Sequence, residues 1–218
     1  PFAVGAFAWQ QRRTLKAHGS PLLPLPLFRD RGFASGQLVQ VLSSIGNGGY
    51  VLVLLYYVQS ALGFSALAAG LTLLPFALGS MVATPLAILA TKRMGKWAVL
   101  AGGMVQAGAL TWVLWTISAN GPSLTGWDLT APLALTGAGM MTLIMPLTSI
   151  ALESVPTQDA GAASGTLTTF SQVGMVLGVA LAGTVFFGVL QDAAEARDAI
   201  TTALWVPIAA YALAGLAA

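Results

Sequence analysis

Long stretches without a charged side chain constrain this chain more than any other feature of its sequence. No Asp, Glu, Lys or Arg occurs within residues 32–91, nor within 97–127, 129–152 or 160–191. Soluble domains carry about 25% charged residues because their surfaces face water, whereas this chain is 7% charged and 56% hydrophobic. A chain of this composition is expected to present most of its outer surface to lipid.

The uncharged stretches are long enough to cross a bilayer as helices, since a crossing takes about 20 apolar residues. The strands of a membrane barrel would be half as long and would alternate in polarity. We therefore expect an all-α membrane protein, a six-transmembrane-helix bundle over 34–218. Its predicted spans are about 34–57, 66–91, 97–118, 131–152, 161–190 and 200–218.

Both ends of the chain are apolar, and we interpret the sequence as a piece of a longer membrane protein. Residues 1–9 are predicted to be the end of a preceding transmembrane helix, and 10–33 a basic loop. At the other end, 211–218 is still apolar where the chain stops.

The loops between the spans predict the orientation in the membrane. Loop 10–33 holds five basic residues and loop 92–96 holds three, so eight of the nine share one side and only Arg197 lies opposite. The positive-inside rule places 10–33, 92–96 and 153–160 in the cytoplasm and predicts a multi-pass protein of the cell membrane. Because the basic residues lie in loops beside apolar spans, we expect no nucleic-acid partner.

Uncharged polar side chains follow one face of the first predicted span. Gln37, Gln40, Ser44 and Asn47 are spaced i, i+3, i+7, i+10, which places them within about an 80° arc of a helix. Amides facing lipid are costly, so this face should meet protein or a water-filled cavity. Hydrogen bonds between helices would explain one amide, whereas three on one face favour a cavity lining.

The fifth and fourth predicted spans carry further cavity candidates. The fifth has a similar polar face formed by Ser164, Thr168, Ser171 and Gln172. The fourth carries Met141 and Met145 after Met140. Methionine adapts to irregular pockets, but it suits ordinary core packing equally well.

Glycines and prolines within the spans predict packing and bending. Gly161 and Gly165, and then Gly174 and Gly178, repeat at four-residue spacing, which lets two membrane helices approach closely. Each proline within a span removes a helix hydrogen bond and predicts a kink. These prolines are Pro75, Pro85 and Pro146.

Missing residue types limit the chemistry. The chain has no cysteine, its one histidine is His18 in the basic loop, and no predicted span holds a carboxylate. Metal sites and acid–base catalysis need such groups, so we expect neither an enzyme, nor a metal site, nor a bound cofactor. Proton coupling also needs a titratable group in the membrane, and these spans hold none.

Three segments resemble the drug exporters of the major facilitator superfamily, and more narrowly their fourteen-helix drug:proton antiporter group. Residues 21–33 read PLLPLPLFRDRGF, close to the family's P-L-L-x-L-x-L-F-R-x-R-x-F. Residues 57–71, with YVQ, LGFS and AGL, resemble its outer turn after helix nine. Residues 155–174, with VP, AGAASG and QVG, resemble the start of its helix thirteen.

The resemblance implies that this chain is the C-terminal six-helix half of such a transporter. In these proteins two bundles face each other around a midplane site and rock to alternate access. The expected partners are the lipid bilayer, the missing N-terminal transmembrane half and a small amphipathic substrate. The missing half would carry the proton-coupling acids, and the proton gradient would supply the energy in the full-length protein.

The resemblance also implies a cytoplasmic gate loop, where this chain departs from the family. The family has G-x-L-x-D-R-x-G-R, and residues 88–96 read ILATKRMGK. Arg93, Gly95 and Lys96 match, whereas Lys92 stands where the family has Asp. The charge network that usually closes this gate is therefore altered in this half.

The favoured function is proton-coupled efflux of drugs or other small molecules by alternating access. Two alternatives remain open at the level of sequence. One is an uptake carrier or an exporter of a native metabolite within the same superfamily. The other is a truncated, non-transporting membrane assembly module.

Overall fold

The structure is a computed structural model that describes residues 31–153, 155, 160–191 and 196–217. The predicted end of a preceding helix (1–9), nearly all of the basic loop 10–33 and most of the loop 153–160 lie outside the described residues.

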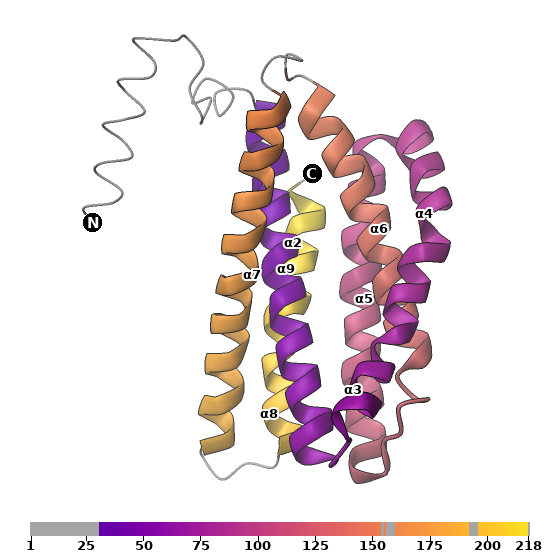
Figure 1. Cartoon of the computed structure of the whole chain (residues 1–218), viewed down its shortest axis with the longest axis vertical. Coiled ribbons are helices and arrows are strands. Elements are labelled where there is room, and N and C mark those ends of the chain that lie inside the picture. The colour runs from indigo at the N-terminus through magenta and orange to yellow at the C-terminus, as the bar shows by residue number, and fades with distance from the viewer. Residues whose placement is uncertain (1–30, 154, 156–159, 192–195, 218) are drawn as a thin grey trace, which may run out of the picture.

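The described residues form helices and no strands (Figure 1). Six helical stretches are long and apolar enough to cross a membrane, which confirms the all-α, six-helix prediction. The first extends from α2 into a π-helical turn, Tyr57–Ala61, and two others are each built from two consecutive α-helices. The α-helices are α2 (Arg31–Tyr56), α3 (Ala66–Thr72), α4 (Leu74–Met94), α5 (Lys96–Asn120), α6 (Thr130–Glu153), α7 (Ala160–Gln191), α8 (Ala196–Ala203) and α9 (Trp205–Leu216).

Prolines explain why two of the spans are broken. The break between α3 and α4 falls at Leu73, just before Pro75, and the break between α8 and α9 falls at Leu204, just before Pro207. Proline has no N–H to donate and its ring clashes with the carbonyl four residues earlier, so the preceding turn cannot continue regularly. Pro85 and Pro146 lie inside α4 and α6, which remain continuous.

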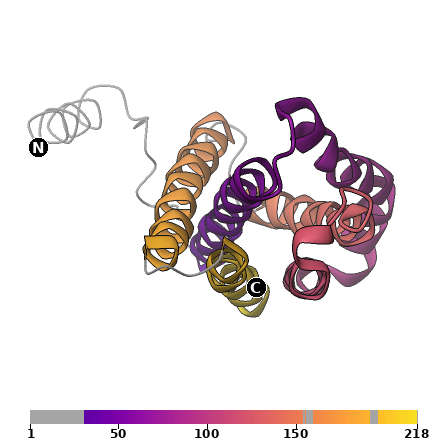
Figure 2. The same ribbon diagram turned by 90° about the horizontal axis from the view of Figure 1, so that it is seen from below.

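Helix packing divides the bundle into two similar groups (Figure 2). In one group α2 packs against α7 and α9, and in the other α6 packs against α4 and α5. The groups meet where α5 contacts α9 and where α2 contacts α6. If spans one, two and three are exchanged with spans four, five and six, every one of these contacts becomes another contact of the same pattern. Because three crossings separate the corresponding spans, they run in opposite directions. The bundle is thus an inverted repeat of three spans, as in many transporters.

Glycines make the closest helix contact in the first group. A Cβ added at Gly48 of α2 would meet the carbonyl oxygen of Met175 in α7. A Cβ added at Gly178 of α7 would meet the carbonyl oxygen of Ile45 in α2. Each glycine therefore lies against the backbone three residues before the other, so the two helices touch directly.

The second group repeats this contact with the same spacing. A Cβ added at Gly79 of α4 would meet the carbonyl oxygen of Ala134 in α6, and one at Gly137 would meet that of Phe76. Both carbonyls again lie three residues before the partner glycine. The two groups therefore have the same backbone contact between two helices as well as the same pattern of helix packing.

The four glycines predicted to pack on α7 differ in their surroundings. Gly174, like Gly178, faces α2, where an added Cβ would lie 2.7 Å from the carbonyl oxygen of Val41. Gly161 and Gly165 are exposed, and an added Cβ would have no neighbour within 4 Å.

Two apolar cores fill the bundle at different depths. The larger core includes the fully buried side chains of Leu54, Leu110, Phe186 and Leu204. The smaller core gathers around Leu143, with four residues from other parts of the chain. These four are Val39, Val99, Leu147 and Ala214. Along α2, α5 and α6 the two cores lie at different heights, which leaves a layer between them.

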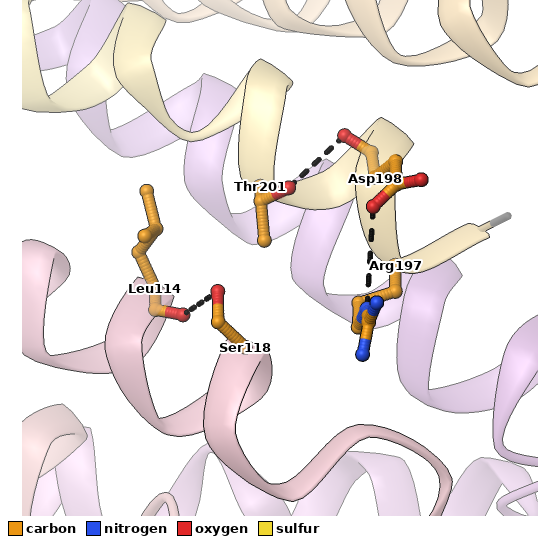
Figure 3. Close-up of polar contacts among 5 residues, drawn as sticks. All are labelled: Leu114, Ser118, Arg197, Asp198 and Thr201. Atoms are coloured by element: carbon orange, nitrogen blue, oxygen red, sulfur yellow. Dashed lines mark hydrogen bonds and ion pairs between the residues drawn. The ribbon is translucent and has the colours of Figure 1, made fainter. Parts of the chain in front are cut away.

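Near one end of the bundle, α8 lies beside the last turns of α5 (Figure 3). The hydroxyl of Ser118 donates to the Leu114 carbonyl at 2.9 Å, and that of Thr201 donates to the Asp198 carbonyl at 3.1 Å. Arg197 Nε lies 4.0 Å from Asp198 Oδ1, and both side chains are exposed. Such an exposed pair contributes about 0–1 kcal/mol, so helix packing rather than this ion pair holds α8 in place.

The end of α5 and the turn that follows it are ordered by local contacts. Gly121 ends α5 with φ 49°, and the guanidinium of Arg197 lies beside it. A cation is stabilising at a helix C-terminus, where the helix dipole is negative. Further on, the backbone N–H of Thr125 donates to Asp128 Oδ2 at 2.8 Å and its hydroxyl donates at 2.7 Å. These bonds hold the pKa of the Asp128 carboxyl below its usual range.

The glycine contacts generate a prediction about stability. Gly178→Ala places a methyl group against the α2 backbone, so we expect it to destabilise the protein by about 1–3 kcal/mol, as overpacking does. Gly79→Ala should have a similar effect, because its contact is the same in the second group. The measurement is thermal unfolding of the detergent-solubilised protein.

Gly188→Ala is the matched control. Gly188 lies in α7, is exposed and has no atom within 4 Å of an added Cβ, so the gain in helix propensity should leave stability unchanged or higher. Equal stability of the Gly178 and Gly188 variants would contradict the proposed backbone contact.

Candidate functional site

A cavity of about 160 Å³ lies in the layer between the two apolar cores. Five helices contribute to it, namely α2, α5, α6, α7 and α9. Its lining is formed by Gln40, Ser43, Ser44, Asn47, Gln106, Met140, Ile144, Ser171, Met175 and Tyr211.

The polar face predicted on α2 is divided between this cavity and α7. Gln40, Ser44 and Asn47 line the cavity. Gln37 lies outside it, buried against α7, where its amide nitrogen donates to the Thr166 carbonyl at 3.3 Å. The amide oxygen of Gln37 has no partner.

Hydroxyl groups on the cavity wall are largely paired within the protein. The Ser43 hydroxyl donates to the backbone carbonyl of Gln40 at 3.0 Å. The hydroxyls of Ser44 and Ser171 lie 2.9 Å apart and form a hydrogen bond between α2 and α7. These bonds fix the wall and leave the side-chain amides of Gln40 and Asn47 as its adaptable polar groups.

The other predicted residues of α7 lie away from the cavity. Ser164, Thr168 and Gln172 are exposed, and the Thr168 hydroxyl donates to the carbonyl of Ser164 at 3.0 Å. Within α7 it is Ser171 and Met175, one helical turn apart, that line the cavity.

The methionines of α6 divide in the same way. Met140 and Ile144, spaced i and i+4, line the cavity, whereas Met141 and Met145 are half-buried beside it. One residue along a helix rotates a side chain by about 100°, so adjacent positions face different neighbours.

Two cavity residues did not emerge from the sequence, and both are 1% exposed. They are Gln106 of α5 and Tyr211 of α9. The sequence does indicate Gln106 as a candidate, because it is a lone amide inside an apolar span, and polar residues inside membrane spans often mark functional sites. Tyr211 lies well inside its predicted span, whereas tyrosine in membrane helices usually lies at the interface.

Close packing holds both of these side chains in position. The Tyr211 ring covers Gly46 of α2, where an added Cβ would lie 2.7 Å from ring carbons. Gln106 lies against Gly139 of α6, where an added Cβ would lie 3.0 Å from its Cγ. Larger residues at either glycine would displace the ring or the amide.

The polar atoms at this end of the cavity lack partners. Both amide atoms of Gln106 and the hydroxyl of Tyr211 are buried without a hydrogen bond. The amide and the hydroxyl lie near each other, but they do not meet with hydrogen-bond geometry. One bond between them would still leave part of the amide unpaired.

The lining determines what the cavity can do chemically. It contains amides, hydroxyls, thioethers and an aliphatic side chain, and none of its ten residues is charged. Among the described residues, no cluster of His, Cys, Asp or Glu could hold a metal ion. This set of groups can bind a small molecule through hydrogen bonds and apolar contacts.

The predicted gate-loop residues lie together where α4 ends and α5 begins. Lys92 and Arg93 are exposed in the last turn of α4, and Gly95 ends it with φ 53°. Lys96 begins α5, and its Nζ lies 5.9 Å from the centre of the Trp97 ring.

A larger groove of about 660 Å³ lies at the opposite end, between α3, the start of α4 and the turn before α6. Its walls are mainly apolar, including Leu71, Leu78 and the exposed Trp127. It lacks the convergent buried polar groups that make the smaller cavity the better candidate for a specific site.

Comparisons with known proteins identify the family of this chain. The family model of the Major Facilitator Superfamily matches residues 8–179. A probable actinorhodin transporter of Streptomyces coelicolor is 37% identical over 195 residues, covering 88% of this chain and 33% of the relative.

Two further relatives show the same partial coverage. The tetracenomycin C resistance and export protein of Streptomyces glaucescens is 30% identical over 83% of this chain and 33% of its own length. The multidrug efflux pump LfrA of Mycolicibacterium smegmatis is 33% identical over 85% of this chain and 36% of its own length. The chain spans about a third of the length of these relatives. By its sequence match and its bundle of membrane helices, the chain belongs to the major facilitator superfamily.

Proposed function

We propose that this chain is the C-terminal six-helix half of a proton-driven exporter of small amphipathic molecules. The observation that carries the proposal is the uncharged polar cavity, which lies between two apolar cores in a bundle of membrane helices. In transporters of this kind, binding sites lie near the bilayer midplane, and two bundles alternate access around them. The names of the matched relatives support export as the direction of transport.

An exposed polar face on α7 supports a partner bundle. Ser164, Thr168 and Gln172 lie on the surface of a helix that is mainly apolar. An amide facing hydrocarbon is costly, so this face should be covered by protein or line a water-filled space. A second six-helix bundle beside this face would cover part of it and enclose a water-filled space with the rest.

Energy coupling is assigned to the other half. No acidic residue and no histidine lines the cavity of this chain. Proton coupling in a membrane needs such a group, so the missing N-terminal half would supply it, and the proton gradient would drive export. This half would shape the substrate cavity.

We also propose the orientation, with 10–33, 92–96 and 153–160 in the cytoplasm. Figure 1 draws the α4–α5 junction and the facing ends of α6 and α7 at the same end of the bundle. The turns after α2 and after α5 lie at the opposite end. Basic residues gather at the first of these ends, which agrees with the positive-inside rule.

Replacing both free amides of α2 tests the cavity assignment. Gln40→Leu combined with Asn47→Leu removes two polar groups from the wall, so we expect efflux of ethidium by the full-length protein to fall about tenfold, as for two lost hydrogen bonds. Efflux is followed by fluorescence in cells, and the amount of protein in the membrane is measured by immunoblot.

The matched control replaces two amides outside the cavity, Gln59→Leu with Asn120→Leu, and should leave efflux unchanged. Gln59 is exposed in the π-helical turn and Asn120 ends α5. Unchanged efflux in the Gln40 and Asn47 variant, at equal expression, would remove these residues from the site.

The orientation is tested by labelling single cysteines. This chain has no cysteine, so Lys92→Cys and Ser123→Cys each introduce one exposed thiol in a full-length protein made otherwise cysteine-free. We expect a membrane-impermeant maleimide to label intact cells at position 123 and to label position 92 only after lysis. Labelling of position 92 in intact cells would reverse the orientation.

A further inference from the structure

We propose that the buried end of the cavity, at Gln106 and Tyr211, is a subsite for an uncharged aromatic ring that carries a hydroxyl or carbonyl group. The inference rests on the proposed function, because it names the class of substrate that this half of the transporter would select. It concerns a different part of the cavity from the amides of α2.

Unpartnered polar atoms are the first argument. Gln106 Oε1, Gln106 Nε2 and Tyr211 Oη are buried and have no hydrogen-bond partner. Leaving a buried donor or acceptor unpaired is unfavourable, and a membrane offers no solvent to satisfy it. All three atoms belong to residues that line one cavity. A rotation of the Gln106 amide or the Tyr211 ring toward the cavity would let a molecule that enters it pair with them.

The chemical character of these atoms defines the matching group. The amide provides one acceptor and two donor hydrogens, and the phenol is both donor and acceptor. A ligand hydroxyl or carbonyl can therefore be satisfied here in either direction. No carboxylate lines the cavity, so a cationic group placed at this end would be desolvated without a counter-charge.

Size and wall composition define the rest of the ligand. The cavity measures about 160 Å³, close to the roughly 150 Å³ of an engineered protein cavity that binds benzene. One ring of a ligand such as 2-naphthol therefore fits, and its second fused ring would extend through the open side of the cavity. Met140, Ile144 and Met175 form the apolar walls, and methionine sulfur makes favourable contacts with aromatic rings.

Packing holds the subsite open and in place. The Tyr211 ring lies on Gly46 and the Gln106 stem lies against Gly139, so neither side chain can move toward those helices. Both residues are 1% exposed, so they form the most deeply buried part of the cavity lining. Gln40 and Asn47 are only half-buried.

Tyr211→Phe and Gln106→Met in the full-length protein test the subsite directly. Each removes polar atoms while keeping most of the side-chain volume. We expect the Kd of 2-naphthol, measured by its fluorescence with purified protein, to rise about tenfold in either variant. The Kd of tetraphenylphosphonium should change much less, so the ratio of the two constants is the diagnostic quantity.

Tyr50→Phe is the matched control, because the Tyr50 hydroxyl is also buried and unpartnered but Tyr50 does not line the cavity. Its naphthol affinity should equal that of the unmodified protein. Without ligand, Tyr211→Phe should melt no lower than the unmodified protein, since no internal hydrogen bond is lost. A lower melting temperature would indicate a structural role and overturn the inference.

The remaining outcomes separate the inference from the proposed function. If Tyr211→Phe and Tyr50→Phe bind naphthol equally, or if both ligands weaken by the same factor, the subsite is wrong even when efflux is intact. If naphthol binds and the Tyr211 and Gln106 variants lose it, the subsite stands. It would stand even if the full-length protein exported neither compound in proteoliposomes, a result that would contradict the proposed function alone.

Discussion

Direct contact between helix backbones at glycine is the interaction on which this structure depends. Lipid is as apolar as leucine, so helices in a membrane gain little from burying apolar side chains and associate through close packing and hydrogen bonds instead. Here the contact of Gly48 with α7 brings the serines of α2 and α7 within 2.9 Å of each other. At the junction of the two groups, a Cβ on Gly103 of α5 would lie 2.8 Å from the Cα of Gly215 in α9. These contacts determine which side chains face the layer that contains the cavity.

Hydrogen bonding within the helices explains why the cavity stands out. Most hydroxyls in the spans donate to a carbonyl of their own helix, as Thr84 does to Ser80 at 2.8 Å and Thr136 to Pro132 at 2.9 Å. Such groups are satisfied without any neighbour. Amides reach less readily to their own backbone and need a partner from another helix or a ligand. Gln37 finds one on α7, whereas Gln106 finds none, and that contrast separates a packing amide from a candidate binding group.

Much of the candidate site was accessible to sequence reasoning, and the limits have physical causes. The face of α2 is predictable because helical periodicity alone places Gln40, Ser44 and Asn47 together. Whether a member of that face meets a neighbouring helix or open space depends on where the neighbour crosses, so Gln37 could not be separated from Gln40. On α7 the same periodicity identified a polar face, but most of that face lies on the surface of this bundle. Gln106 and Tyr211 come from helices whose contribution to the cavity follows only from how the five helices meet.

The sequence by itself determined that this chain is a bundle of six membrane helices, because stretches of uncharged residues of bilayer length admit no other fold. It also determined the distribution of its basic loops and the family that its motifs resemble. Only the tertiary structure decided which helices touch, that the same kind of glycine contact occurs in each of the two groups of three spans, and that a cavity lies between two cores. The reason is that charge and hydropathy are properties of single residues, whereas a cavity and an unpaired amide are relations between residues distant in the chain.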